Sequence, residues 1–350
     1  MQPLDLSVVI PTYDRPGLLR ETLESVLAQT VPAREIVVVD NGHGDEAAAL
    51  LEEYRGRVTT LRMEPEGVQA ARNLGIRSTT TTWVATLDDD DLWAPDFLQT
   101  VGSVLQDGRA DLIYCDHRKF GVTPDGERYY TPATNAELAP SGYWDGVPRP
   151  ADGDAWSYVG SFPPERLLRF NGFYASTMVI RRDLLDRIGL FDLAMRGKKA
   201  EDIELTARAL AHGRLAMVWE PLVLYRVHDA NDSGGDIVAG RIGRWEIFEY
   251  LHARDAAGSP GLAAALERDL PVRRGAVFDL AFRHQQADVL ARVMPLLRPE
   301  DWTPKRRLKR AVVRLPPGLR QRVLHVGGRL IPGLERDRAA ARRVYPQRSA

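Results

Sequence analysis

The first third of the chain alternates short apolar runs with segments of helical periodicity, and this alternation constrains the fold more than any other feature. The apolar runs, such as LSVVI and EIVVVD, are rich in β-branched residues and have the length of strands. Strands that alternate with helices form βαβ units around a parallel sheet, and uniformly apolar strands suit a sheet covered on both faces. We expect strands at 6–10, 35–40, 58–63, 83–87 and 110–116, and helices at 16–30, 45–54, 68–78 and 94–106.

Acidic residues stand at the ends of two of these strands. Asp40 ends the second run, and four consecutive aspartates, 88–91, follow the fourth run in LDDDDLW. Ligands of such sheets bind beyond the carboxyl ends of the strands. A helix cap needs one carboxylate, whereas four neighbouring carboxylates repel one another, and their hard oxygens suit Mg²⁺ or Mn²⁺. We interpret the run as a site for a metal and a nucleotide; the alternative is an acidic loop that binds no ion.

The first turn has neither of two common glycine-rich nucleotide motifs. Its sequence, PTYDRPG, contains no G-x-G-x-x-G, and the chain contains no G-x-x-x-x-G-K-[ST]. This argues against an NAD site and against a P-loop. Asp40 itself has two interpretations: it accepts a hydrogen bond from a base or ribose, or it is a turn residue before Gly42.

Candidate catalytic residues also occur in the second half of the chain. Glu201 and Asp202 begin a helix expected at 200–213, where the helix dipole favours negative charge. They are either capping residues, or one of them is a general base for an attacking hydroxyl. His228 ends an apolar stretch, and it can complete a Mn²⁺ site, bind phosphate when protonated, or be structural.

Residues 117–170 are expected to be irregular because they are rich in glycine, proline and aromatic residues. A loop of this length is unusual in a compact domain unless it is functional or disordered. Its segment 141–164 carries Trp144 and Trp156, whose rings suit a sugar or an apolar aglycone. We interpret it as an acceptor site or a lid, with a surface loop anchored by buried aromatics as the alternative.

The distribution of charge sets the basic end of the chain apart. Residues 305–350 carry 14 Lys and Arg against 2 Asp and Glu, a net charge of +12 that leaves −13 on the other 304 residues, since the whole chain carries −1. Such a tail suits an anionic membrane surface, or it is a solvated helix. Nucleic acid is not expected, because no binding motif is present.

The compartment is predicted from cysteine usage and apolar runs. Cys115 is the only cysteine, so the chain has no internal disulfide and no cysteine-rich zinc site. No run approaches the roughly 18 apolar residues of a membrane helix, and the N-terminus lacks a signal-peptide pattern. We therefore predict a cytoplasmic protein, with the tail as a candidate peripheral contact at the inner face of the membrane.

The motifs, taken in order, resemble those of family 2 glycosyltransferases with the GT-A fold. They are SVVIPTYDRPGLLRETLESVLAQT, EIVVVDNG, AARNLGI, LDDDDLWAPDFL, STMVIRRDLLDRIGLFD, EDIELTARALAHG and EPLVLYRVH, and they cover about residues 5–230. The resemblance implies an α/β fold in which helices flank a Rossmann-like, mostly parallel central sheet, followed by a helical C-terminal extension.

The expected organisation has three parts. The GT-A domain would span 1–235, with a nucleotide-binding half at 1–116 and an acceptor-binding half at 117–235. A helical extension would follow at 236–304, and the basic tail would span 305–350. The first boundary rests on NDSGGD, which breaks the pattern near 230–240.

The resemblance also implies which residues contact the nucleotide-sugar. Asp40 would accept the uracil N3–H, Arg72 would reach the base or the diphosphate, and Asp88 would lie near the ribose. The full set implied along the donor is Pro11, Thr12, Tyr13, Asp40, Arg72, Asp88 and Asp89.

Metal binding and base catalysis are assigned in the same way. The resemblance implies that Asp90 binds the metal and that His228 touches the metal or the diphosphate. Since four aspartates leave the register of the D-x-D pair open, Asp89 and Asp91 are alternatives. Asp202, the second residue of the Glu-Asp pair, would be the catalytic base. Accessory contacts are expected from Asp91, Glu201, Trp144 and Trp156.

The implied reaction is inverting sugar transfer from a nucleoside diphosphate sugar to an acceptor hydroxyl, with Mn²⁺ or Mg²⁺. UDP is expected first, then dTDP or GDP, and the acceptor is a cell-surface glycan, a lipid-linked glycan or a secondary metabolite. One alternative is a nucleotidyltransferase of similar fold, although its glycine- and lysine-rich first turn is missing. The other is a non-catalytic scaffold that binds nucleotide-sugars.

Overall fold

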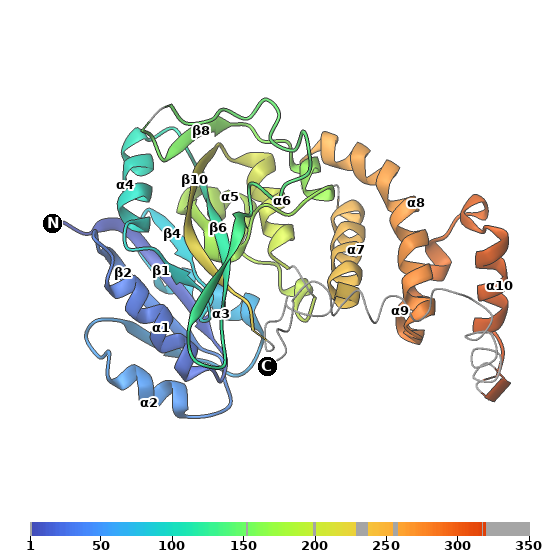
Figure 1. Cartoon of the computed structure of the whole chain (residues 1–350), viewed down its shortest axis with the longest axis horizontal. Helices are drawn as coiled ribbons and strands as arrows, with labels where there is room; N and C mark the ends of the chain where they lie inside the picture. Colours follow the sequence, from blue (N-terminus) through green and yellow to red (C-terminus); the bar gives the residue numbers. More distant parts are fainter. Residues whose placement is uncertain are drawn as a thin grey trace. The chain divides into compact units, whose positions relative to one another are not determined.

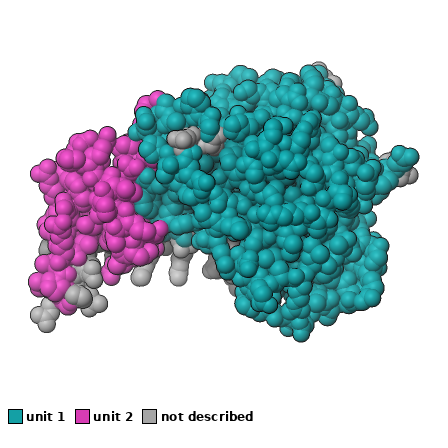
Figure 2. Space-filling model, turned by 180° about the vertical axis from the view of Figure 1, so that it is seen from behind, with its two compact units in different colours: residues 1–267 teal, residues 268–350 magenta. Residues whose placement is uncertain are grey.

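The computed structural model describes residues 2–151, 153–198, 201–228, 237–254, 258–316 and 318–319. The chain divides into two compact units, residues 1–267 and 268–350, which are coloured separately in Figure 2. The predicted domain boundary at 235/236 lies outside the described residues, so it stays a prediction.

A single mixed sheet forms the centre of the first unit (Figure 1). Its strand order is β3-β2-β1-β4-β9-β6-β10-β5, with β7 paired to β6 and β8 paired to β10. The strands are β1 (Leu4–Thr12), β2 (Ala33–Asp40), β3 (Thr59–Arg62), β4 (Trp83–Thr86), β5 (Leu92–Trp93), β6 (Leu112–Val122), β7 (Arg128–Thr134), β8 (Trp156–Gly160), β9 (Met178–Arg181) and β10 (Leu215–Arg226).

Helices connect most of these strands and continue beyond them. The α-helices are α1 (Pro16–Leu27), α2 (Glu46–Glu52), α3 (Val68–Ser78), α4 (Phe97–Asp107), α5 (Arg182–Ile188), α6 (Asp202–His212), α7 (Ile237–Ala253), α8 (Pro260–Arg283), α9 (Ala287–Val293) and α10 (Pro304–Val313). A short 3₁₀ turn, η2 (Ala175–Thr177), precedes β9. None of the helices in the described ranges is both long enough and apolar enough to cross a membrane.

The α/β fold predicted from the alternating pattern is confirmed, and one half of the sheet is parallel throughout. β3, β2, β1 and β4 are all parallel, as βαβ units require. β9 is antiparallel to both β4 and β6, so the other half is mixed. The local sequence of β9 does not reveal its direction, because strand direction depends on the connection and not on the apolar pattern.

Both faces of the parallel half are buried, which explains its uniformly apolar strands. Leu6, Val8 and Ile10 of β1 belong to the main core together with α1 and α4, whereas Val37 and Val39 of β2 pack with Ala71 of α3 on the other face. Helix α3 lies very close to the sheet at Gly75: a Cβ atom there would be 2.4 Å from Val9 Cγ1. This close packing fixes the position of the residues that α3 presents to the site.

The expectation that residues 117–170 are irregular is wrong for three segments. β6 continues to Val122, and β7 and β8 also fall in this range. Their sequences, such as RYYTPAT, lack a continuous apolar run, and most residues of β7 are exposed. These strands form because neighbouring strands supply hydrogen-bond partners, a context that local propensity does not register.

Candidate active site

Polar residues meet at the carboxyl edge of the parallel strands, as predicted. Thr12 at the end of β1 is the register partner of Asp40 at the end of β2. The segment after β4 stays beside β1, because the Leu87 N–H donates to the Val9 carbonyl at 3.0 Å. The aspartate run therefore starts next to the ends of β1 and β2.

Asp89 is buried beneath this edge and is held by β1 and the turn after it. Its Oδ2 accepts hydrogen bonds from Thr12 Oγ1 at 2.6 Å and from the Tyr13 N–H at 3.3 Å, and its Oδ1 lies 2.6 Å from Arg15 Nη2. Burial raises the pKa of Asp89 to about 7, although Arg15 and Thr12 oppose this effect. These contacts tie the acidic loop to the turn PTYDRPG.

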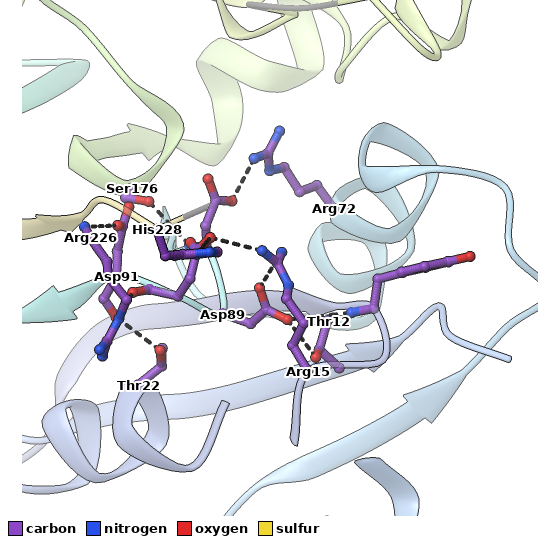
Figure 3. Close-up of polar contacts among 12 residues, drawn as sticks. Thr12, Arg15, Thr22, Arg72, Asp89, Asp91, Ser176, Arg226 and His228 are labelled. Carbon is purple, nitrogen blue, oxygen red and sulfur yellow. Dashed lines mark hydrogen bonds and ion pairs between the residues drawn. The ribbon is translucent and has the colours of Figure 1, made fainter. Parts of the chain in front are cut away.

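Asp90 connects Arg15 with His228. Its Oδ2 accepts a hydrogen bond from Arg15 Nη1 at 2.8 Å and lies 3.1 Å from His228 Nε2. In Figure 3 the dashed lines from Arg15 lead to Asp89 and to the carboxylate beside His228. The structure therefore brings together Asp90 and His228, which are 138 positions apart in the sequence.

Asp91 is buried and ties the acidic loop to β10. Its Oδ1 accepts the Arg226 N–H at 2.9 Å, and its carbonyl accepts Thr22 Oγ1 at 2.9 Å. Burial, followed by repulsion from Asp90 and Asp88, raises the pKa of Asp91 well above its usual range. Asp88 keeps 31% of its side chain exposed and Asp90 keeps 10%, whereas Asp89 keeps 1%. The assignment of Asp88 and Asp90 as the ligand-facing pair stays a prediction.

Arg72 lies in a network of carboxylates from two different elements. The guanidinium of this buried side chain reaches Asp88 Oδ1 at 2.5 Å and Glu201 Oε1 at 3.0 Å, and it lies over the ring of Phe191. Burial alone would lower the pKa of Arg72, but the two carboxylates outweigh it and raise the pKa. Arg72 is thus a fixed positive charge beside the start of α6; its predicted contact with base or diphosphate stays a prediction.

Asp202 is the first residue of α6, directly after Glu201. Its carboxyl group accepts a hydrogen bond from the Ala175 N–H of η2. Burial and then the Glu201 carboxylate raise the pKa of Asp202 to about 7, against the opposing effect of Arg72. A carboxyl group with such a pKa can accept a proton near neutral pH, as a general base must.

Asp40 is the last residue of β2 and lies at the carboxyl edge of the sheet, opposite Thr12 of β1. Its Oδ1 accepts the Gly42 N–H at 3.0 Å. Its Oδ2 is buried and has no hydrogen-bond partner among the described residues, while Arg62 Nε lies 3.8 Å away. The half-exposed ring of Tyr13, the residue after Thr12, contacts the ring of His43 edge-on. A free acceptor atom at this strand end suits an N–H group of a bound base.

The acidic loop is suited to hold a cation. Asp89 and Asp90 already hold the Arg15 guanidinium, and Asp90 Oδ2 and His228 Nε2 lie close enough to share one ion. Within the described ranges, no three His, Cys, Asp or Glu side chains gather around one point. Two protein ligands leave coordination positions for substrate phosphates, which is how Mg²⁺ and Mn²⁺ are commonly bound.

The two accessory tryptophans have structural partners. The Trp144 ring packs in an aromatic cluster with Tyr143, Phe162 and Trp219, and its Nε1–H donates to the Ala136 carbonyl at 3.0 Å. Trp156 lies in β8 opposite Val218 and packs against the main core. These contacts match a loop anchored by aromatics, and a role of either ring in acceptor binding stays a prediction.

Three residues of the site were not identified from the sequence. Arg15 binds Asp89 and Asp90, the Ser176 hydroxyl accepts the Asp88 N–H at 3.2 Å, and Arg226 Nε donates to the Asp90 carbonyl at 2.8 Å. Arg15 had a signal, since it is a cation in the turn that faces an acidic loop. Ser176 and Arg226 lie far from the run of aspartates in sequence, and only tertiary structure places them beside it.

Comparison with sequence families identifies related proteins. The family model described as Glycosyl transferase family 2 matches residues 7–188, just over half of the chain. The succinoglycan biosynthesis protein ExoW of Rhizobium meliloti is 26% identical over 305 residues, which is 82% of this chain and 92% of that protein. An uncharacterized glycosyltransferase of Rickettsia typhi is 26% identical over 235 residues, and the match spans 64% of each chain.

Solved structures share the fold. TarS 1–349 of S. aureus in complex with UDP-GlcNAc superposes with a TM-score of 0.58 and 16% identity, over 85% of this chain and 83% of that one. The mannosyltransferase PcManGT of Pyrobaculum calidifontis, in complex with GDP-Man and Mn²⁺, gives a TM-score of 0.52 and 21% identity, over 86% and 78%.

Proposed function

Because this chain belongs to glycosyltransferase family 2 and has the GT-A fold, we propose that it transfers a sugar from a nucleoside diphosphate sugar to an acceptor hydroxyl with inversion. One observation carries the proposal: Asp202, with its raised pKa, lies beside the Arg72–Asp88 ion pair at the carboxyl edge of the sheet. A proton acceptor and a fixed cation are thus adjacent where a ligand of this fold binds.

The chemistry assigned to these residues is a single displacement. The acceptor oxygen forms a bond to the anomeric carbon while the bond from that carbon to the diphosphate oxygen breaks, so the configuration inverts. The electron pair leaves with the diphosphate, and the acceptor proton passes to the Asp202 carboxylate. Arg72, fixed by Asp88 and Glu201, supplies preorganised positive charge near the leaving group.

We assign Asp90 and His228 as the residues that would hold Mn²⁺ or Mg²⁺. Such an ion, when bound, supplies positive charge that stabilises the departing diphosphate. Arg15 holds the Asp90 carboxylate in the free protein, so ligand binding at Asp90 would require Arg15 to change partners. The donor phosphates would offer Arg15 new acceptors.

The choice of donor base rests on Asp40 Oδ2, which accepts no hydrogen bond from the described residues. This oxygen can accept the N3–H of uracil or thymine or the N1–H of guanine. UDP comes first in this proposal and dTDP or GDP second. TarS and PcManGT were solved with UDP-GlcNAc and GDP-Man respectively, which supports testing both bases.

The proposal is tested by thermal unfolding with UDP-, dTDP- and GDP-sugars, each with and without Mn²⁺. A ligand that binds only the native state raises the midpoint, and we expect a metal-dependent rise of about 2–4 °C with one nucleotide. Release of the nucleoside diphosphate from that donor should follow. Release of pyrophosphate would instead indicate a nucleotidyltransferase, and binding without any turnover would indicate a scaffold.

We also propose that the protein is cytoplasmic and contacts an anionic membrane surface through its basic end. In α10, Arg306 and Lys309 pair with Asp279, and Arg310 lies over the Trp302 ring. These contacts turn a different face outward, on which Leu308 is 67% exposed next to the exposed Arg307. An exposed leucine beside an exposed cation suits the interface of an anionic bilayer.

This contact is checked by co-sedimentation with vesicles of phosphatidylcholine alone or with 30% phosphatidylserine. We expect the full chain to bind the anionic vesicles, each basic residue near the surface adding about 1 kcal/mol, and 0.5 M salt to release it. Leu308→Glu should weaken binding. Equal sedimentation with both vesicle types would remove the membrane from the proposal and leave the transferase untouched.

A further inference from the structure

A cationic and aromatic surface lies beside the proposed catalytic base. His117 and Lys119 project from the same face of β6, since they are two residues apart in a strand. β10 runs parallel to β6 there, with Tyr225 opposite Lys119, and Lys119 Nζ lies 5.7 Å from the centre of the Tyr225 ring. Tyr174 completes the group: its ring centre is 4.9 Å from that of His117 and 5.7 Å from that of Tyr225.

This surface is adjacent to Asp202 through the backbone of η2. Tyr174 immediately precedes Ala175, whose N–H is the hydrogen-bond donor to Asp202. Burial raises the pKa of Tyr174 to about 12, the Asp202 charge adds to this rise, and Arg244 of α7 opposes it. Tyr174 therefore lies within electrostatic range of both Asp202 and Arg244.

The ammonium group of Lys119 forms no ion pair with an acidic side chain in the parts of the chain that the structure describes, and its side chain is partly buried. Burial lowers the pKa of Lys119, and the same cause together with the Lys119 charge lowers the pKa of His117 to about 3. A partly desolvated cation without a counter-ion is unfavourable, and an anion from a ligand would offset that cost.

His117 adds a second unsatisfied group to the same surface. Its ring is almost fully buried, and neither ring nitrogen has a hydrogen-bond partner among the described residues. A neutral imidazole can donate from one nitrogen and accept at the other, so it can bind a sugar hydroxyl. The flat rings of Tyr174 and Tyr225 offer the apolar surface against which the faces of a sugar pack.

We propose that His117, Lys119, Tyr174 and Tyr225 form an acceptor subsite for a sugar unit that carries an oxyanion, either a phosphate or a carboxylate. The inference rests on the proposed transferase function and names its acceptor class. Tyr174 and Tyr225 hold the sugar, Lys119 pairs with its anionic group, and the acceptor hydroxyl then faces Asp202. Lys119 takes no part in proton transfer; it selects and positions the acceptor.

The competing occupant of Lys119 is the donor diphosphate, because Tyr225 is three residues before His228. The two occupants predict different results when Lys119 is changed. If Lys119 binds the acceptor, Lys119→Met leaves the affinity for nucleotide unchanged. If Lys119 binds the donor, the same change weakens nucleotide binding.

The test measures binding of three probes to the full chain by saturation-transfer NMR, with UDP and Mg²⁺ at saturation. The probes are glucose 6-phosphate, glucuronic acid and glucose, so the phosphate and carboxylate arms are separated from a neutral reference. We expect one anionic sugar to bind about tenfold more tightly than glucose, the effect of one charge-assisted hydrogen bond. Lys119→Met should abolish this preference, and Lys119→Arg should retain most of it.

Lys305→Met is the matched control, because it removes the same charge from an exposed position of α10. It should leave all three affinities unchanged. The inference is overturned if neither anion binds more tightly than glucose, including the case in which neither binds, or if Lys119→Met lowers the affinity for UDP. Failure of the wild-type protein to bind any nucleotide with Mn²⁺ would instead overturn the proposed function, so the two failures are distinguishable.

Discussion

Replacing Asp202 with asparagine should lower turnover by about 10²- to 10⁴-fold and leave donor binding unchanged. The amide keeps the shape of the side chain and can still accept the Ala175 N–H, but it cannot take a proton from the acceptor hydroxyl. The measurement is the rate of nucleoside diphosphate release with the donor that raises the unfolding midpoint. The midpoint shift of the variant with that donor reports binding separately.

Asp125→Asn is the control for this prediction, since Asp125 lies in an exposed turn and the change has the same chemistry. It should be as active as the wild-type protein. In the wild type, kcat/KM should rise with pH through about 7, because Asp202 must lose its proton to act as a base. Full activity of Asp202→Asn, or a rate independent of pH between 5.5 and 8, would exclude Asp202 as the base.

Replacing Arg72 with methionine should lower the free energy of unfolding by about 3 kcal/mol at pH 8. Arg72 is the buried partner of Asp88 and Glu201, and removing one partner of a buried ion pair leaves its carboxylates uncompensated. The measurement is urea unfolding of the ligand-free protein. Arg20→Met is the control: Arg20 pairs with Glu53 at 2.7 Å on the exposed surface of α1, so its loss should cost far less than the loss of Arg72.

The stability deficit of Arg72→Met should shrink as the pH falls to 5.5. Asp202 has a pKa raised above its ordinary value in the folded protein, so its neutral form is favoured there. Its contribution to stability is therefore present at low pH and is lost as the pH rises through about 7. Without Arg72, the carboxylates of Asp88, Glu201 and Asp202 repel one another more strongly at high pH, so the variant loses more stability than the wild type as the pH rises. A deficit that is equal at pH 5.5 and pH 8 would show that Arg72 stabilises the protein by packing alone.

Much of the fold could be predicted because its strands and helices have recognisable local patterns of apolar residues. β1, β2 and β4 each contain a short, continuous apolar run, as expected for a strand that is buried on both faces of a sheet. The helices between them carry an apolar stripe, and α1 begins at Pro16, where a proline is tolerated. The direction of β9 and the strand β8 depend on partners far away in sequence, which a local pattern does not show. Strand β7 pairs with the preceding strand β6 and was missed because it has no continuous apolar run.

The same division applies to the site. A run of four aspartates at a strand end predicted a place for a cation, because neighbouring carboxylates repel one another. In the folded protein the guanidinium groups of Arg15 and Arg72 pair with three of the four carboxylates. Which aspartate faces a ligand was open in the sequence, since neighbouring positions are chemically identical. Hydrogen bonds from Thr12 and Arg226 hold Asp89 and Asp91 in the folded protein, and which of the four aspartates face a ligand stays a prediction.

The sequence alone therefore predicted the alternating strands and helices of the parallel half of the sheet, and it placed Asp40 and the aspartate run at the carboxyl edge of that half. These features could be predicted because hydrophobic periodicity and the position of a residue relative to a strand end are visible in a few neighbouring residues. Only the tertiary structure decided that Arg15 reaches Asp89 and Asp90, that burial raises the pKa of Asp202, and that Lys119 lies over the ring of Tyr225. Burial and charge pairing are sums over groups far apart along the chain, and folding alone brings those groups together.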